Sequence, residues 1–313
     1  MRFLKRKTQI NFLGASRRKI ALAVSIVVII ASLASLATRG LNFGIDFTGG
    51  VLLEAGYAQA ADIEAIRASL AAAGFEDASV QRFGADNDVL VRLPPQEGQA
   101  PDALREALRQ AVAYDGKPVE LRRVENVSPQ VGEELAERGS LAMIIALLLI
   151  FVYVMIRFQW KFAAGAVAAL AHDVIVTVGF FSIFQMPFDL TVVAAVLAVI
   201  GYSLNDTVVA FDRIRENFLK LRGVEADESM NISINQMLAR TLITGLTTLL
   251  VLIALLSLGG ESIAPFSIAL IVGIIVGTYS SIYTASATAL LLGVNAQDLL
   301  EPVKDPDLID DLP

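Results

Sequence analysis

Cysteine is absent from the 313 residues, and histidine occurs once, as His172. The absence of cysteine excludes a disulfide framework, a thiolate metal site and a cysteine nucleophile, although it is compatible with any compartment. Charged residues make up 18% of the chain, whereas a soluble globular domain contains about 25%. The nucleotide-binding patterns GxxxxGK[ST] and GxGxxG do not occur. These absences argue against a soluble, nucleotide-dependent enzyme.

Long apolar segments are abundant, and 55% of all residues are hydrophobic. A helix needs about 20 apolar residues to cross the hydrocarbon core of a bilayer. Six segments approach or exceed that length, so the sequence predicts a polytopic α-helical membrane protein. The predicted spans are 20–38, 140–156, 162–184, 190–211, 237–258 and 265–292.

Basic residues indicate the orientation of these spans, because cytoplasmic loops carry an excess of Lys and Arg. They are frequent in 1–19, 157–161 and 212–236, and absent from 185–189 and 259–264. We therefore expect both termini to be cytoplasmic, including an acidic tail at 293–313. The first span exceeds the roughly 7–15 apolar residues of a signal peptide, which favours a retained anchor over a cleaved signal.

The polar block 39–139 is predicted to be a periplasmic α+β domain. Its pattern of alternating strands and amphipathic helices reads β-α-β-β-α-β, the ferredoxin-like order. "ADND" (85–88) is expected to form the turn of the central hairpin, and Gly74 is expected to end the first helix. No catalytic constellation is evident, so a binding or mechanical module is favoured over an enzyme domain. Residues expected on the buried helix faces are Ile63, Ile66, Leu70, Ala73, Leu104, Leu108, Ala111 and Val112.

Two charges are predicted at similar depth in antiparallel spans. Asp206 precedes Phe211 by five residues, which places it about 7–8 Å inside the fourth span, and Arg240 lies about one turn inside the fifth. A carboxylate in hydrocarbon costs about 2.5–3.5 kcal/mol on insertion scales. The two residues form either a static ion pair or part of a proton pathway, and the closeness of Asp206 to the cytoplasm favours the pathway. Asn205 is a weaker candidate for the same pathway. Polar neighbours predict a polar interior or hydrated crevice instead of a lipid-facing surface: Tyr202, Ser203, Thr244, Thr247 and Thr248.

His172 and Asp173 are predicted near the middle of the bilayer. Asp173 shares a face of small residues with Gly165, Ala169 and Thr177, which suits close helix packing. A role in proton transfer and a purely structural role both remain open for this pair. After Phe211, apolar residues at helical spacing predict an interfacial helix on the cytoplasmic surface.

"GIDFTGG" (44–50) connects the first span to the external domain. Its glycines permit a sharp turn, and the alternative connection, "SPQVGEELAERG" (128–139), is expected to run as a stiff helix into the second span. We therefore predict that Gly44, Gly49 and Gly50 form a hinge.

These motifs, with "AHDVIVTVG" (171–179), "GYSLNDTVVAFDRIREN" (201–217) and "RTLITGLTTLL" (240–250), closely resemble the SecF family. Its members are the smaller subunits of the SecD–SecF protein-export complex and belong to the resistance-nodulation-division (RND) superfamily of proton-driven machines. The resemblance covers nearly the whole chain. It implies an RND-like half of six spans and a multi-pass location in the bacterial inner membrane, and it matches Asp206 and Arg240 to the proton-pathway residues of the family.

The resemblance further implies the partners SecD, the SecYEG channel and an exported unfolded polypeptide, besides membrane lipid. The proton gradient is expected to supply energy for a late, ATP-independent stage of export, with no cofactor, metal, enzymatic activity or nucleic-acid binding. Two other functions compete with this one. A small-molecule or lipid exporter of the same superfamily usually carries both halves in one chain, and a passive scaffold leaves buried Asp206 unexplained.

Overall fold

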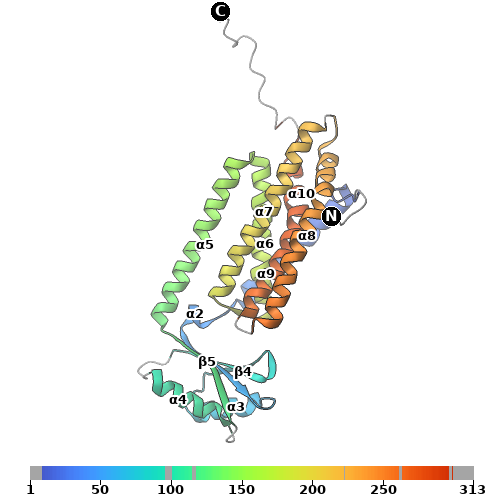
Figure 1. Ribbon diagram of the computed structural model, residues 1–313. Helices are drawn as coiled ribbons and strands as arrows, with labels where there is room; N and C mark the ends of the chain where they lie inside the picture. The colour runs from blue at the N-terminus through green and yellow to red at the C-terminus, as the bar shows by residue number, and fades with distance from the viewer. Residues whose placement is uncertain are drawn as a thin grey trace, which may run out of the picture.

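The computed structural model describes residues 9–95, 101–114, 118–221, 223–260, 263–295 and 298. Figure 1 shows a bundle of long helices with a small α/β domain at one end. The first eight residues, and most of the predicted acidic tail, lie outside the described residues.

Within the described ranges, six helices are long and apolar enough to cross a membrane. Five of them cover a predicted span completely, and the sixth covers all but the last residue of the span predicted at 265–292. The last contains a π-helical segment, η3, between two α-helical parts. The helices are α1 (Ala15–Arg39), α5 (Pro129–Arg157), α6 (Trp160–Phe184), α7 (Leu190–Lys220), α8 (Ala226–Leu258) and the sixth, formed by α9 (Ala264–Ser280), η3 (Ser281–Ala285) and α10 (Ser286–Leu291).

Helix α5 connects the α/β domain to the bundle without a break, as predicted. The Ser128 hydroxyl accepts a hydrogen bond from the Val131 N–H at 3.4 Å, and Pro129 occupies the first turn. Both residues favour a helix start at this point. Figure 1 shows α5 along one side of the bundle, rising from the small domain.

The prediction of a separate interfacial helix after Phe211 is wrong, because α7 continues to Lys220. Ile214 and Phe218 are buried in one hydrophobic cluster with Met230 and Ile234 of α8. An apolar stripe has the same spacing whether a helix packs on a membrane surface or on another helix. The sequence pattern therefore could not separate these two arrangements.

The α/β domain has the predicted ferredoxin-like topology. Its four strands form an antiparallel sheet in the order β3–β4–β2–β5. In Figure 1 the two helices lie on the side of the sheet that faces away from the bundle. The elements follow one another as β2 (Gly50–Tyr57), α3 (Ile63–Ala72), β3 (Ser79–Phe83), β4 (Ala85–Leu93), α4 (Pro101–Val112) and β5 (Val119–Val127).

The core of this domain lies between the sheet and its helices. Alternate residues of β2, from Val51 to Tyr57, pack against Ile66 and Leu70 of α3 and Leu108 of α4. Burial of such side chains stabilises a domain by about 1.5–3 kcal/mol for each large one. Ala73, expected on the buried face, is exposed, because α3 ends at Ala72.

The hairpin turn lies at Gly84, before the residues predicted to form it. Residues 85–88 belong to β4, and Phe83 pairs with Ala85 across Gly84. Gly84 has a φ of +76°, a left-handed backbone that glycine adopts without strain. The register of β3 against β4 shifts between Arg82 and Phe83, so the polar residues of "ADND" lie in an irregular end of the hairpin, and the sequence pattern presented that end as the turn.

Gly50→Ala should destabilise the α/β domain by more than about 2 kcal/mol. Gly50 has a φ of +116°, and a Cβ atom there would lie 2.2 Å from the Leu93 carbonyl oxygen. Gly74→Ala is the matched control, since Gly74 has a φ of +91° with open space around it. Thermal unfolding and limited proteolysis of the purified chain should show a larger loss for Gly50→Ala. Equal losses would contradict the steric explanation.

Candidate functional site

Asp206 lies on the buried face of α7. Its side chain is 6% exposed, and its Oδ2 atom has no hydrogen-bond partner among the described residues. The adjacent Thr207 hydroxyl is also buried without a partner there. Buried polar groups are almost always hydrogen-bonded, and a carboxylate is the most costly group to leave unpaired. The packing of the helices therefore does not explain why α7 has two adjacent buried polar side chains at this point.

Arg240 does not form an ion pair with Asp206. It is exposed on α8, and no ion pair within 4.0 Å joins the two side chains, although the guanidinium lies within electrostatic reach of the carboxylate. The static ion pair is thus not the arrangement in this chain. The helices are neighbours, as expected, but Arg240 points outward from their contact.

A polar face of α7 and α8 is open on the outside of the bundle. Asn205 and Gly201 are exposed on α7, and Thr244 and Thr247 are exposed on α8. The two threonine hydroxyls donate to carbonyl oxygens of α8 itself, such as that of Arg240 at 3.1 Å from Thr244. Thr244 and Thr247 thus lie on an outer face of the single chain, whereas Ser203, which was predicted in the same polar interior, is buried.

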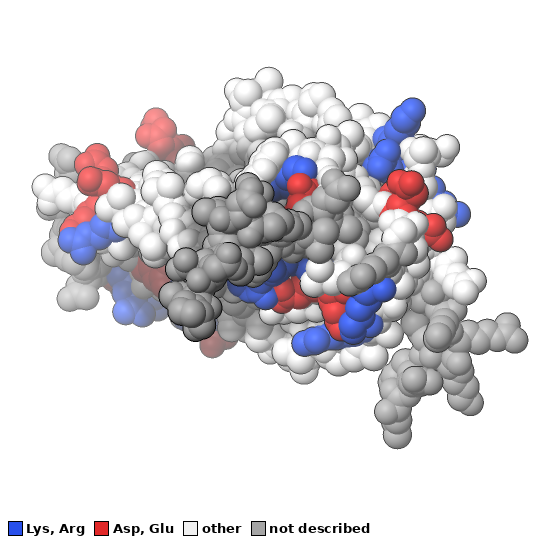
Figure 2. All heavy atoms as spheres, turned by 90° about the horizontal axis from the view of Figure 1, so that it is seen from above, with Lys and Arg blue, Asp and Glu red and all other residues white. Residues whose placement is uncertain are grey.

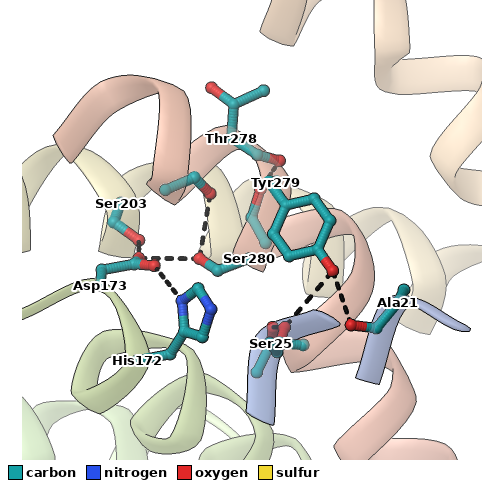
Figure 3. Close-up of polar contacts among 11 residues, drawn as sticks. Ala21, Ser25, His172, Asp173, Ser203, Thr278, Tyr279 and Ser280 are labelled. Atoms are coloured by element: carbon teal, nitrogen blue, oxygen red, sulfur yellow. Dashed lines mark hydrogen bonds and ion pairs between the residues drawn. The ribbon is translucent and has the colours of Figure 1, made fainter. Parts of the chain in front are cut away.

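His172 and Asp173 form a buried cluster with residues of two other helices (Figure 3). Asp173 is fully buried, and its Oδ2 accepts hydrogen bonds from the Ser203 hydroxyl of α7 at 2.5 Å and the Ser280 hydroxyl of α9 at 2.7 Å. His172 Nδ1 lies 3.0 Å from the other carboxylate oxygen. As predicted, Gly165, Ala169 and Thr177 share the buried face of Asp173.

A second set of polar contacts joins α1 to the last helix. The Tyr279 hydroxyl donates to the Ala21 carbonyl at 2.7 Å, and the Ser25 hydroxyl lies 3.4 Å from the Tyr279 hydroxyl. Figure 3 shows Tyr279 directed toward α1 and Ser280 toward Asp173. The sequence pattern did not single out Tyr279 and Ser280. Ser280 lies three residues after Gly277 and therefore shares its helix face, which was the available signal for Ser280.

The predicted hinge glycines lie in a packed connection. The Gly44 N–H donates to the Phe188 carbonyl at 2.8 Å, where β1 (Asn42–Phe43) pairs in parallel with β6 (Pro187–Phe188). Gly49 has a φ of +68°, and a Cβ atom there would lie 2.9 Å from Pro129 Cα. Packing and backbone geometry thus give a reason for Gly44, Gly49 and Gly50. Their role as a hinge stays a prediction.

Asp46 of the same segment, in α2 (Ile45–Thr48), contacts the start of α7. Its Oδ2 accepts a hydrogen bond from the Leu190 N–H at 3.0 Å. A carboxylate at a helix N-terminus is stabilised by the unpaired N–H groups and the helix dipole. The connection from the α/β domain therefore touches the helix that carries Asp206.

Arg92 of β4 adds a contact from the sheet itself. Its Nη1 donates to Asn42 Oδ1 at 3.0 Å. Burial lowers the pKa of the Arg92 guanidinium, and the negative charge of Asp189 opposes that effect. The sheet is thus joined to the membrane-proximal loops by a side-chain contact that spans 50 residues of sequence.

Comparison with known proteins matches this chain to an established protein family. A family model described as the C-terminal part of protein export membrane protein SecD/SecF matches residues 108–295, and a SecD/SecF GG motif matches 34–61. Protein translocase subunit SecF of Pseudomonas aeruginosa is 51% identical over 304 residues, covering 97% of this chain and 98% of that protein. The chain belongs to the SecF family. It is therefore a multi-pass inner-membrane subunit of the Sec protein translocase.

Other SecF relatives agree with this assignment. SecF of Escherichia coli O157:H7 is 44% identical over 90% of this chain and 88% of that protein. The crystal structure of SecDF, a translocon-associated membrane protein from Thermus thermophilus, has a TM-score of 0.82 and 36% identity over 91% of this chain. This chain spans 39% of that SecDF chain. The SecD/SecF match at 108–295 contains His172, Asp173, Asp206 and Arg240, and the GG motif contains the three predicted hinge glycines.

Proposed function

We propose that this chain works with SecD and uses the proton-motive force to promote the late, ATP-independent stage of protein export. The carrying observation is Asp206, a buried carboxylate in a membrane helix whose Oδ2 lacks a hydrogen-bond partner among the described residues. An ionisable residue at this depth is costly and marks ion or proton pathways. Asp206 binds and releases protons in this proposal, and the gradient supplies the energy without a cofactor.

A membrane partner completes the site. The face with Asn205, Arg240 and Thr244 is polar, yet it is exposed on the outside of the bundle. Exposing an arginine to hydrocarbon is unfavourable, so this face packs against protein. SecD is the partner proposed, because the SecDF chain of Thermus thermophilus extends well beyond the part that this chain matches.

We propose that the α/β domain lies in the periplasm and both termini in the cytoplasm. The bundle end away from that domain carries Arg157, Lys161, Arg213 and Lys220 among acidic residues, with ion pairs such as Arg157–Asp212 at 2.5 Å. Figure 2 views the molecule from this end and shows basic and acidic side chains close together. An excess of basic residues in short loops favours the cytoplasmic side.

The periplasmic domain is proposed to act on the unfolded polypeptide as it leaves the SecYEG channel. The chain has no P-loop, and a proton crossing about 100 mV releases about 2.3 kcal/mol. That free energy shifts a two-state equilibrium by more than tenfold, since about 1.4 kcal/mol corresponds to one decade. The connection to this domain contacts the start of α7 through Asp46, and Arg92 of the sheet contacts Asn42 of β1, so the domain is positioned to follow such a shift.

Export in inverted inner-membrane vesicles tests the proposal. A precursor is first driven partly across with ATP, the ATP is removed, and completion is followed with the proton gradient intact or collapsed. Vesicles that contain this chain and SecD should complete export in a gradient-dependent manner, whereas vesicles without this chain should not. The same gradient dependence in both vesicle types would contradict the proposal.

Arg240→Lys should reduce gradient-driven export partly, and Arg240→Ala should reduce it more strongly. Arg240 lies on α8, which packs beside the helix that carries Asp206, and a nearby positive charge favours the ionised form of a carboxylate. Lysine keeps the charge but loses the planar group of donors. The vesicle assay measures both variants, with Arg213→Lys at the exposed end of α7 as the control. Full activity of Arg240→Ala would exclude this role.

A further inference from the structure

Asp173 lies where three membrane helices meet. It belongs to α6 and is fully buried, and its hydroxyl partners Ser203 and Ser280 belong to α7 and α9. Both hydroxyls donate to the same oxygen, Oδ2, while Oδ1 faces His172 Nδ1 at 3.0 Å. An ionised carboxylate accepts hydrogen bonds without donating any. One side chain thus connects three helices through contacts that satisfy both of its oxygen atoms.

Helices α7 and α9 approach each other closely at this point. A Cβ atom on Gly277 would lie 3.1 Å from Ser203 Cβ and 3.5 Å from Asp173 Oδ2. One turn away, a Cβ atom on Gly273 would lie 2.1 Å from Val199 Cγ2. Small residues at such spacing allow two membrane helices to come into backbone contact. The hydrogen bonds to Asp173 then set how the two helices align along this contact.

The last helix changes its geometry directly after the contact. Ser280 is the final residue of α9, and the π-helical segment η3 begins at Ser281. Single π-helical turns inside α-helices often occur at functional sites. A hydrogen bond from Ser280 to Asp173 therefore secures the last regular turn before an irregular one.

The same contact lies one turn from Asp206. Ser203 precedes Asp206 by three residues on α7, and both side chains are buried. Residues at this spacing share a helix face. We propose that Asp173 is a positioning residue, whose carboxylate binds hydroxyl groups of α7 and α9 and holds the turn of α7 that carries Asp206. This inference rests on the proposed proton role of Asp206, and it assigns no proton transfer to Asp173.

Asparagine at position 173 separates positioning from proton transfer. The amide oxygen can accept from both serine hydroxyls, and the amide N–H can donate to the neutral imidazole of His172. Asp173→Asn should therefore retain at least about half of the gradient-dependent export of the wild type. Asp173→Ala leaves two buried hydroxyls without their acceptor and should lower it about tenfold, which corresponds to about 1.4 kcal/mol.

Thermal unfolding of the purified complex with SecD provides a readout that does not depend on proton coupling. The midpoint temperature of unfolding should fall clearly for Asp173→Ala and for the double variant Ser203→Ala, Ser280→Ala. It should fall only slightly for Asp173→Asn. If Asp173→Ala does not assemble, the double serine variant replaces it in both assays. If export by the wild-type complex does not depend on the gradient, the proposed function is wrong. The unfolding midpoints of the variants still test the contact between Asp173 and the two serines in that case.

Two results would overturn the positioning role. Asp173→Asn as inactive as Asp206→Asn, with a normal unfolding midpoint, would show that Asp173 titrates during transport. Wild-type export and stability in both the alanine variant and the double serine variant would show that the contact positions nothing. Loss of export in the alanine and serine variants with recovery in Asp173→Asn supports the proposal.

Discussion

Asp206→Asn is expected to abolish gradient-dependent export while the protein still inserts and binds SecD. The amide has nearly the same shape as the carboxylate but does not titrate, so packing of α7 is preserved and proton binding is lost. The stimulation that the gradient provides, more than about tenfold for one proton across about 100 mV, should disappear. The vesicle assay measures this loss, and proton flux in vesicles that contain the purified complex measures it independently.

Asp212→Asn is the matched control on the same helix. Asp212 is 43% exposed and pairs with Arg157 at 2.5 Å, and exposed ion pairs contribute at most about 1 kcal/mol. This variant should export normally. If Asp206→Asn also exports normally under a full gradient, Asp206 is not the proton carrier. Failure of Asp206→Asn to insert or to bind SecD would point to a structural role instead.

A reversible tether between the α/β domain and the membrane-proximal loops should stop gradient-driven export. Asn42 lies on the bundle side of the predicted hinge and Arg92 on the sheet side, and their side chains meet at 3.0 Å. Asn42→Cys with Arg92→Cys can be joined by a short, reducible thiol cross-linker. The chain contains no cysteine, so both attachment sites are unique. Motion about Gly44, Gly49 and Gly50 is blocked while the tether is intact.

Export should fall to the level without a gradient after cross-linking and recover after reduction. The control tether joins Asp88→Cys to Arg122→Cys, because that pair meets at 2.6 Å inside the sheet and does not cross the hinge. It should leave export unchanged. Full export with a confirmed tether between positions 42 and 92 would show that the domain works as a fixed platform.

Patterns along the chain were sufficient to predict the architecture. Six apolar segments predicted six membrane helices because the hydrocarbon thickness sets a minimum length that each segment must meet. The β-α-β-β-α-β order predicted the sheet topology, and Ile66, Leu70 and Leu108 were correctly assigned to its core. The spacings of 2 residues in a strand and 3.6 residues in a helix arise within each element, so they can be recognised from the sequence alone.

The same local patterns were ambiguous where the identity of the neighbour mattered. Phe218 continues an apolar stripe that suits a lipid surface or another helix, and only the packing of α7 on α8 decided between them. The glycines of 44–50 suggested flexibility, whereas the contacts of Gly49 with Pro129 and of Gly50 with Leu93 showed positions at which a side chain does not fit.

The candidate site was also predicted only in part from the sequence, and the tertiary structure decided the rest. The cost of burying a carboxylate singled out Asp206 and Asp173 from the sequence, because that cost belongs to the residue itself. Which groups surround each carboxylate depends on helix rotation and register, to which the sequence pattern is insensitive. Tertiary structure alone therefore turned Arg240 outward from Asp206 and brought Ser203 and Ser280 to one oxygen of Asp173.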